Sequence, residues 1–219
     1  SYSNRLALMF FCLIFGMVQQ QEQIPIIFSS RLLYYRERGA KAYSAVPYFI
    51  STWAYVLTIV AVYEAFFCMV IYQMTGLTTH QGQTNFTRFY FTILLFCYAC
   101  IFFFQFVSHV NKSQQAAVGI SPLGIFFNVL FAGFIIFIPN LQSWLVWGPY
   151  ISFYRYAFQS LVLNELKDNP DLTASSIYLD QLGFDSLSSP DCIWILLLFT
   201  FGTCFMAGFA VKYIDHEQR

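Results

Sequence analysis

Long apolar stretches separated by short polar segments make up most of this chain. Five of them approach the roughly 20 residues that an α-helix needs to cross the hydrocarbon core of a membrane. They are residues 5–27, 45–75, 86–109, 117–138 and 191–213. We therefore predict an all-α polytopic membrane protein, with five transmembrane helices in a single membrane domain over residues 1–219.

The first two stretches depart from an average span. Residues 45–75 exceed the thickness of a bilayer at about 1.5 Å per residue, so this helix is expected to tilt or to extend beyond the membrane. The first stretch holds the 13-residue apolar run LALMFFCLIFGMV and then the polar residues 19–23. Those polar side chains must face protein or water rather than lipid.

Residues 139–190 follow a different pattern. Trp and Tyr cluster in the first half of this segment, as they do at the membrane–water interface, which is typical of a re-entrant or in-plane helix. The second half is polar and predicts a loop exposed to water. We therefore predict a re-entrant and extracellular segment before the last helix.

Composition agrees with a membrane protein. Hydrophobic residues make up 58% of the chain and charged residues 10%, whereas soluble domains carry about 25% charged residues. The net charge is zero, which argues against nucleic-acid binding. The six cysteines lie mostly in apolar runs without a second Cys or His cluster, so we predict free thiols and no metal site. Motifs of soluble enzymes are absent, and no residue is a candidate for catalysis.

The distribution of Lys and Arg predicts the orientation. If residues 28–44 are cytoplasmic, seven of the eleven basic residues lie inside and four outside, as the positive-inside rule requires. Residues 139–190 are then extracellular or lumenal. Of the two N-x-S/T sequons, Asn85 lies outside and is a possible glycosylation site, whereas Asn111 lies inside.

Several ordered motifs carry a resemblance to a known family. Arg36 and Glu37, followed by Tyr43 and Ser44, form an R-E-x(n)-Y-S element. NRLALMFF precedes it, and the sequence FAGFIIFIPNLQSWLVWGPYISFYRYAF occupies residues 131–158. In this order the motifs resemble the membrane domain of G-subfamily ABC transporters, including the pleiotropic-drug-resistance type, from its second membrane helix to its C-terminus.

The resemblance implies what accompanies this sequence. The five spans correspond to helices two to six of a six-helix exporter domain, so the first helix and an ATP-binding domain are expected upstream. This chain would hold no cofactor, and ATP and Mg²⁺ would bind in that domain. Residues 28–44 would be a cytoplasmic coupling segment, in which Arg36, Glu37 and Arg38 contact the ATPase. The alternative is that these charges are topology signals.

The resemblance also places a substrate path between two copies of the domain. It would be lined by Phe15, Val18, Phe126, Asn128 and Val129, and such an apolar slot suits sterols, lipids or lipophilic drugs. The alternative for each residue is ordinary helix packing or a lipid-facing position.

Two positions above the path correspond to the family's apolar valve, namely Phe134 and Ile135 after Gly133. The family often has Leu there, so Phe134 is a departure: its ring either narrows the exit or swings as a gate.

Glu64 lies well inside the second span, where a charged carboxylate costs roughly 3 kcal/mol on insertion scales. It therefore needs a partner or a proton. Two roles are open: a polar contact for substrate or coupling, or a carboxylic acid that is hydrogen-bonded within the bundle.

The sequence thus predicts the membrane part of an ATP-driven exporter that works by alternating access, in the plasma membrane. The expected partners are an ABC nucleotide-binding domain, a second transmembrane domain that is identical or different, membrane lipids and a lipophilic substrate. The alternatives are a channel or ion-coupled carrier without an ATPase, and a membrane receptor or assembly subunit that does not transport. Inverted repeats and paired broken helices, which an ion-coupled carrier often shows, are not found in the sequence.

Overall fold

A computed structural model describes residues 2–41, 44–75, 83–166, 179–184 and 187–214. Over these residues the secondary structure is helical and contains no strand, which confirms the all-α class. The elements are α1 (Tyr2–Gln20), α2 (Gln23–Gly39), α3 (Ala45–Met74), α4 (Gln83–Val110), α5 (Gln114–Leu130), the 3₁₀ turns η2 (Ile138–Asn140) and η3 (Ser143–Leu145), α6 (Gly148–Ile151), α7 (Phe153–Leu166) and α9 (Ser189–Tyr213).

Three described helices are long and apolar enough to cross a membrane. These segments are Val46–Met74, Phe86–Val110 and Ser189–Tyr213, and Gln114–Leu130 is a shorter apolar helix. By length and composition these helices fit the predicted integral membrane protein.

Local sequence signals fix where two of these helices begin. The Ser113 hydroxyl oxygen accepts a hydrogen bond from the Ala116 amide (3.3 Å) at the start of α5. At the start of α9, Ser188 and Asp191 form a reciprocal capping box. Both arrangements satisfy backbone N–H groups that the first turn of a helix leaves without partners.

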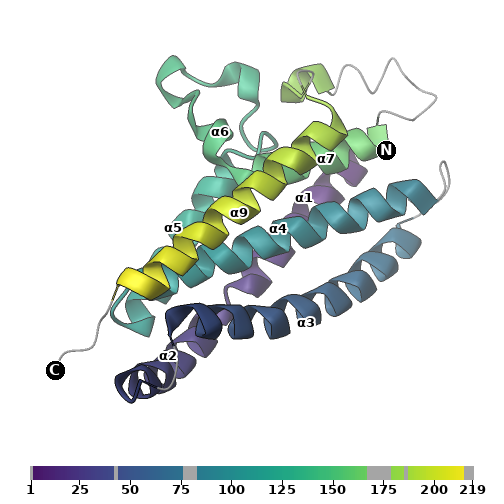
Figure 1. Ribbon diagram of the computed structural model, residues 1–219. Coiled ribbons are helices and arrows are strands. Elements are labelled where there is room, and N and C mark those ends of the chain that lie inside the picture. Colours follow the sequence, from purple (N-terminus) through teal and green to yellow (C-terminus); the bar gives the residue numbers. More distant parts are fainter. Residues whose placement is uncertain (1, 42–43, 76–82, 167–178, 185–186, 215–219) are drawn as a thin grey trace.

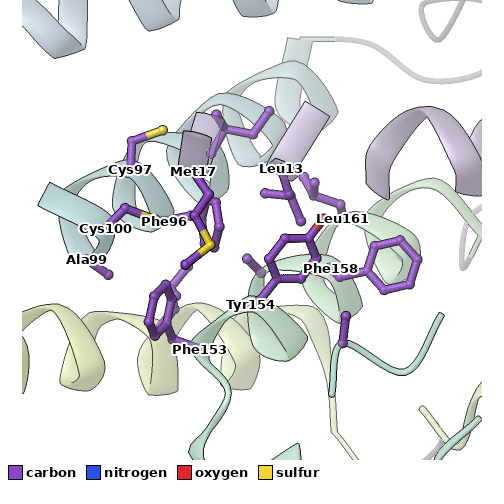
Figure 2. Packing of buried hydrophobic residues seen from close by; sticks show 14 of the residues in the cluster. Leu13, Met17, Phe96, Cys97, Ala99, Cys100, Phe153, Tyr154, Phe158 and Leu161 are labelled. Atoms are coloured by element: carbon purple, nitrogen blue, oxygen red, sulfur yellow. The ribbon is translucent and has the colours of Figure 1, made fainter. Parts of the chain in front are cut away.

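Helix α4 is the centre of the bundle and contacts α1, α2, α3, α5, α7 and α9. In Figure 1 it runs between α3 on one side and α9 with α7 on the other. Figure 2 shows the core where α1, α4 and α7 meet, with Met17, Phe96 and Tyr154 among the labelled side chains. The Tyr154 hydroxyl donates to the Phe10 carbonyl (2.5 Å), which satisfies the polar end of this buried ring.

The two ends of the bundle differ. Helix α2, the turn between α4 and α5, and the last turn of α9 lie at one end, whereas α6 and α7 lie toward the other (Figure 1). Helix α7 lies within residues 139–190, and nearly all its side chains are buried. Sequence composition predicted a re-entrant or in-plane helix in this region, but not that α7 would be so enclosed.

Two helix ends differ from the predicted spans. The chain turns at residues 21–22, so the span predicted at 5–27 is divided between α1 and α2. At this turn the Gln20 amide donates to the Tyr63 hydroxyl (2.7 Å) and the Gln21 amide to the Ser121 hydroxyl (2.6 Å). Gln20 and Gln21 of the polar run therefore face protein, whereas Glu22 is exposed.

The fourth span was predicted to end at residue 138, but α5 ends at Leu130. Gly133 follows with a φ of 88°, a left-handed conformation that turns the chain and that favours glycine. A Cβ atom at this position would lie 3.1 Å from the Phe184 ring. The apolar character of residues 131–138 therefore reflects packing of an irregular segment, not a longer helix.

Candidate functional site

Helices α1 and α5 are neighbours, and Gln21, in the turn directly after α1, donates a hydrogen bond to Ser121 of α5. Each exposes an apolar side that the rest of the described chain leaves uncovered. Phe15 is 55% exposed on α1, where Val18 is also exposed, and Phe126 is 64% exposed on α5. The Phe15 ring stacks on Phe67 of α3, with ring centroids 5.3 Å apart. These three predicted path residues can therefore contact a ligand, lipid or second chain.

The other two predicted path residues have different surroundings. Asn128 is buried, because residues two apart on a helix face nearly opposite sides, and Phe126 occupies the exposed one. The Asn128 side chain donates to the Gly124 carbonyl (3.0 Å), and its backbone carbonyl accepts from the Ser152 hydroxyl (3.0 Å). Val129 is half-buried against the core. Asn128 therefore holds α5 to the start of α7 and faces away from Phe126.

The predicted valve residues lie in the irregular segment after α5. The Phe134 ring packs against Phe10 of α1 and Phe158 of α7, with ring centroids 4.6 and 5.7 Å apart. Ile135 is exposed. In this conformation Phe134 therefore anchors the turn to the bundle, and Ile135 is the member of the pair that a substrate or second chain can reach.

The feature that sequence reasoning missed is the position of Arg31 on α2. This side chain is buried, and its guanidinium donates hydrogen bonds to three backbone carbonyls, those of Ser108 (3.1 Å), Asn111 (2.9 Å) and Lys112 (2.9 Å). The ring of Phe28 lies 4.2 Å from the guanidinium carbon. We call this arrangement the Arg31 clamp, because it ties α2 to the end of α4 and to the α4–α5 turn.

The physical basis of the clamp is the free carbonyls at the end of a helix. The last turn of α4 leaves carbonyl groups without intrahelical partners, and the negative end of the helix dipole attracts a cation. From its position in residues 28–44 alone, Arg31 counts only as one of the basic residues predicted on the cytoplasmic side. Backbone acceptors have no signature in a sequence, so the pattern could not have indicated this contact.

A second set of contacts joins α2 to α3. The Tyr34 ring of α2 stacks on Tyr48 of α3 with centroids 4.1 Å apart, and the hydroxyls of Ser30 and Tyr48 lie 3.1 Å apart. Burial raises the pKa of the Tyr34 phenol above its ordinary value, and nearby Arg38 opposes this effect. Helix α2 is therefore held to α3 as well as to α4.

The predicted ATPase contacts lie in the last turn of α2. Arg36 is exposed, whereas Glu37 and Arg38 are partly exposed, and the Arg38 guanidinium lies over the Tyr34 ring at 5.9 Å. The last turn of α2 lies at the same end of the bundle as the α4–α5 turn (Figure 1). A partner domain docked on this end would contact these side chains directly.

Glu64 is buried on α3, with 1% of its surface exposed. The Cys97 thiol of α4 donates to its carboxyl group (3.3 Å), and no cation among the described residues pairs with it. This environment favours the second of the predicted roles, a carboxylic acid bonded within the bundle.

Among the described residues, no group of three His, Cys, Asp or Glu could hold a metal ion. Asn85, the predicted glycosylation site, has its side chain outside the described set.

Comparisons with known proteins agree with this architecture. The family model of the ABC-2 type transporter matches residues 1–166. The chain is 27% identical to ABC transporter G family member 2 of Dictyostelium discoideum over 98% of its length, and 28% identical to ABC transporter G family member 35 of Arabidopsis thaliana over 89%. It spans 19% and 14% of these two relatives, respectively. These findings confirm the resemblance that the motifs indicated.

Proposed function

Because this chain belongs to the ABC-2 type transporter family, we propose that it is the membrane part of an ATP-driven exporter that moves lipophilic molecules by alternating access. ATP and Mg²⁺ would bind in a nucleotide-binding domain outside this sequence. A second transmembrane domain, identical or different, would complete the substrate path. The plasma membrane is the proposed location.

The observation that carries this proposal is the Arg31 clamp. A movement that arises at a cytosolic ATPase must reach the substrate path through elements that move together. The clamp joins α2, which presents Arg36, Glu37 and Arg38 at the surface, to the turn from which α5 begins. Helix α5 in turn carries Phe126 and leads to the valve segment. A contiguous route therefore runs from the proposed docking surface to the proposed path.

The exposed sides of α1 and α5 support a lipophilic substrate. Phe11, Phe15 and Val18 on α1 and Leu123 and Phe126 on α5 are exposed apolar side chains. Burial of apolar surface contributes about 25 cal/mol per Å² and requires little directional bonding, so such a surface accepts flat or amphipathic molecules of varied shape. Sterols, lipids and drug-like compounds are the classes that fit.

The test is export by the complete transporter in proteoliposomes. We expect ATP hydrolysis that a lipophilic substrate stimulates, and export that Phe126→Ala reduces severalfold. Phe205→Ala is the matched control, because Phe205 is also a largely exposed ring (75%, against 64% for Phe126) and lies on α9, away from α1 and α5. Transport without any ATPase would indicate a channel or carrier instead. A purified intact protein with neither transport nor stimulated hydrolysis would indicate a receptor or assembly subunit.

A further inference from the structure

Arg155 on α7 is a buried charge with no anionic partner in the described part of the chain. Only 4% of its surface is exposed, and its Nε and one terminal nitrogen lack any hydrogen-bond acceptor. The guanidinium lies over two aromatic rings, those of Tyr150 at 5.2 Å and Tyr156 at 5.7 Å. An isolated buried charge is costly, and two ring faces compensate for only part of that cost.

The acid in the first turn of the neighbouring helix α9 is already engaged. Asp191, in the first turn of α9, accepts hydrogen bonds from the Ser188 amide (3.1 Å) and the Ser188 hydroxyl (2.5 Å) in the capping box. Within the described residues, the arrangement around Arg155 therefore lacks an anion with oxygen acceptors. A phosphate group matches the planar fork of a guanidinium and can accept two parallel hydrogen bonds from it.

An apolar groove lies beyond one of the two aromatic rings under Arg155, that of Tyr156. It has a volume of about 650 Å³, within the ~300–1,000 Å³ range of small-molecule sites, and lies between α4, α5 and α9. Its lining includes Phe103, Phe127, Ile151, Phe199, Gly202 and Met206. The Tyr156 ring, which lies under the Arg155 guanidinium, is 5.7 Å from the ring of Phe199. A single aromatic ring thus separates the charge from the groove.

Exposed aromatic side chains indicate the depth of this site in the membrane. Trp144, Trp147 and Tyr150 are all exposed, and Trp and Tyr concentrate at the level of the lipid headgroups. Trp147 stacks on Phe127, a lining residue, with ring centroids 6.0 Å apart. The interfacial residues therefore lie at the end of the groove where Arg155 is found, and the groove continues toward the apolar middle of α9.

We propose that this is a phospholipid-binding site, in which Arg155 binds the phosphate and the groove between α4, α5 and α9 holds an acyl chain. The occupant is a lipid of the leaflet next to α6, and it is distinct from the molecule that moves along α1 and α5. The proposal needs only the membrane location of the chain and not the exporter activity. Its test can therefore fail while export persists, and the reverse also holds.

The experiment uses the complete transporter in nanodiscs without ATP. The probe is a phosphatidylglycerol with a photoreactive diazirine in one acyl chain, and a diacylglycerol with the same chain is the headgroup-free comparison. We expect the phospholipid to label peptides of α5 and α9, and we expect Arg155→Gln to lower this labelling by about tenfold or more, because a charge-assisted phosphate contact is lost. Arg155→Lys should retain an intermediate level.

Two pairs of variants separate site loss from misfolding. Arg88→Gln removes an exposed arginine of α4 and should leave labelling unchanged. Gly202→Leu adds bulk to the groove at a position where nothing lies within 4 Å of a Cβ atom, and should lower labelling. Cys204→Leu adds bulk on the α3-facing side of the same helix and should not. Added phospholipid should raise the melting temperature of the unmodified protein but not that of Arg155→Gln.

Four results would overturn the proposal. The first is equal labelling of Arg155→Gln and the unmodified protein, and the second is diacylglycerol labelling as strong as phospholipid labelling. The third is binding of inorganic phosphate while the acyl chain leaves the groove unlabelled. The fourth is a set of cross-links from Met206 to a second copy of the chain in place of lipid.

Discussion

Replacement of Arg31 by Met tests the route from α2 to the substrate path. The change keeps an apolar stem next to Phe28 and removes all three hydrogen bonds to the carbonyls of Ser108, Asn111 and Lys112. Bonds from a charged donor contribute roughly 1.5–3 kcal/mol each in general. Because the three share one guanidinium and carbonyls at a helix end can regain water, we expect a loss of about 2 kcal/mol for the set.

That loss has a measurable consequence for coupling. About 2 kcal/mol corresponds to roughly a 30-fold shift in the ratio of clamped to released α2. We therefore expect Arg31→Met to hydrolyse ATP at a rate close to that of the unmodified transporter, but to export severalfold fewer substrate molecules per ATP. The assay measures hydrolysis and export in the same proteoliposomes, which separates coupling from the amount of folded protein.

Two further variants make the result specific. Arg31→Lys keeps the charge but lacks the planar fork, so it should recover part of the export per ATP. Arg88→Met, at an exposed site on α4 toward the opposite end, is the matched control and should behave as the unmodified transporter. Folded Arg31→Met with an unchanged ratio of export to hydrolysis would refute the assignment of the clamp to coupling.

Three other predictions concern the docking surface, the valve and the turn. Glu37→Lys should uncouple hydrolysis from export while the complex still assembles, and normal export would remove Glu37 from the interface. Phe134→Ala should slow export more than it weakens ground-state substrate binding, whereas an effect on affinity alone would indicate a pocket residue. Gly133→Ala should destabilise the protein by about 1–2 kcal/mol in a thermal unfolding assay, because an L side chain is strained at its φ of 88° and meets the Phe184 ring. An unchanged melting temperature would contradict that reasoning.

The sequence predicted the long helices well because lipid imposes a length and a composition on them. Helices α3, α4 and α9 are continuous apolar runs, and their observed ends lie within three residues of the predicted spans 45–75, 86–109 and 191–213. The turn at residues 21–22 and the end of α5 at Leu130 were misplaced, because hydropathy does not show where an apolar chain leaves the helical conformation. The positive φ of Gly133 is the local cause of the second turn.

The site was predictable only in part, for a related reason. Phe15, Val18 and Phe126 are exposed as a substrate path requires, but Asn128 faces the opposite side of α5. The roles of Arg31 and Arg155 depend on their surroundings: backbone carbonyls in one case, and aromatic rings without an acid in the other. Neither environment has a pattern in the sequence. The sequence alone therefore shows Arg31 only as a charge on the cytoplasmic side of the membrane and Arg155 only as a charge on the outer side.

The most direct test of the central claim follows α2 and α5 through the ATP cycle in the complete transporter, with Cys204 replaced by Ser. Spin labels at Leu33 and Gln115, exposed sites on α2 and α5, report the distance across the clamp, and a cysteine at position 126 reports access to impermeant thiol reagents. The account predicts that the distance between the labels at positions 33 and 115 stays constant when ATP and vanadate are added. It also predicts that the cysteine at position 126 then reacts with reagent on the outer side in place of the cytoplasmic side. A change in that distance with no change in the access of position 126 would contradict it.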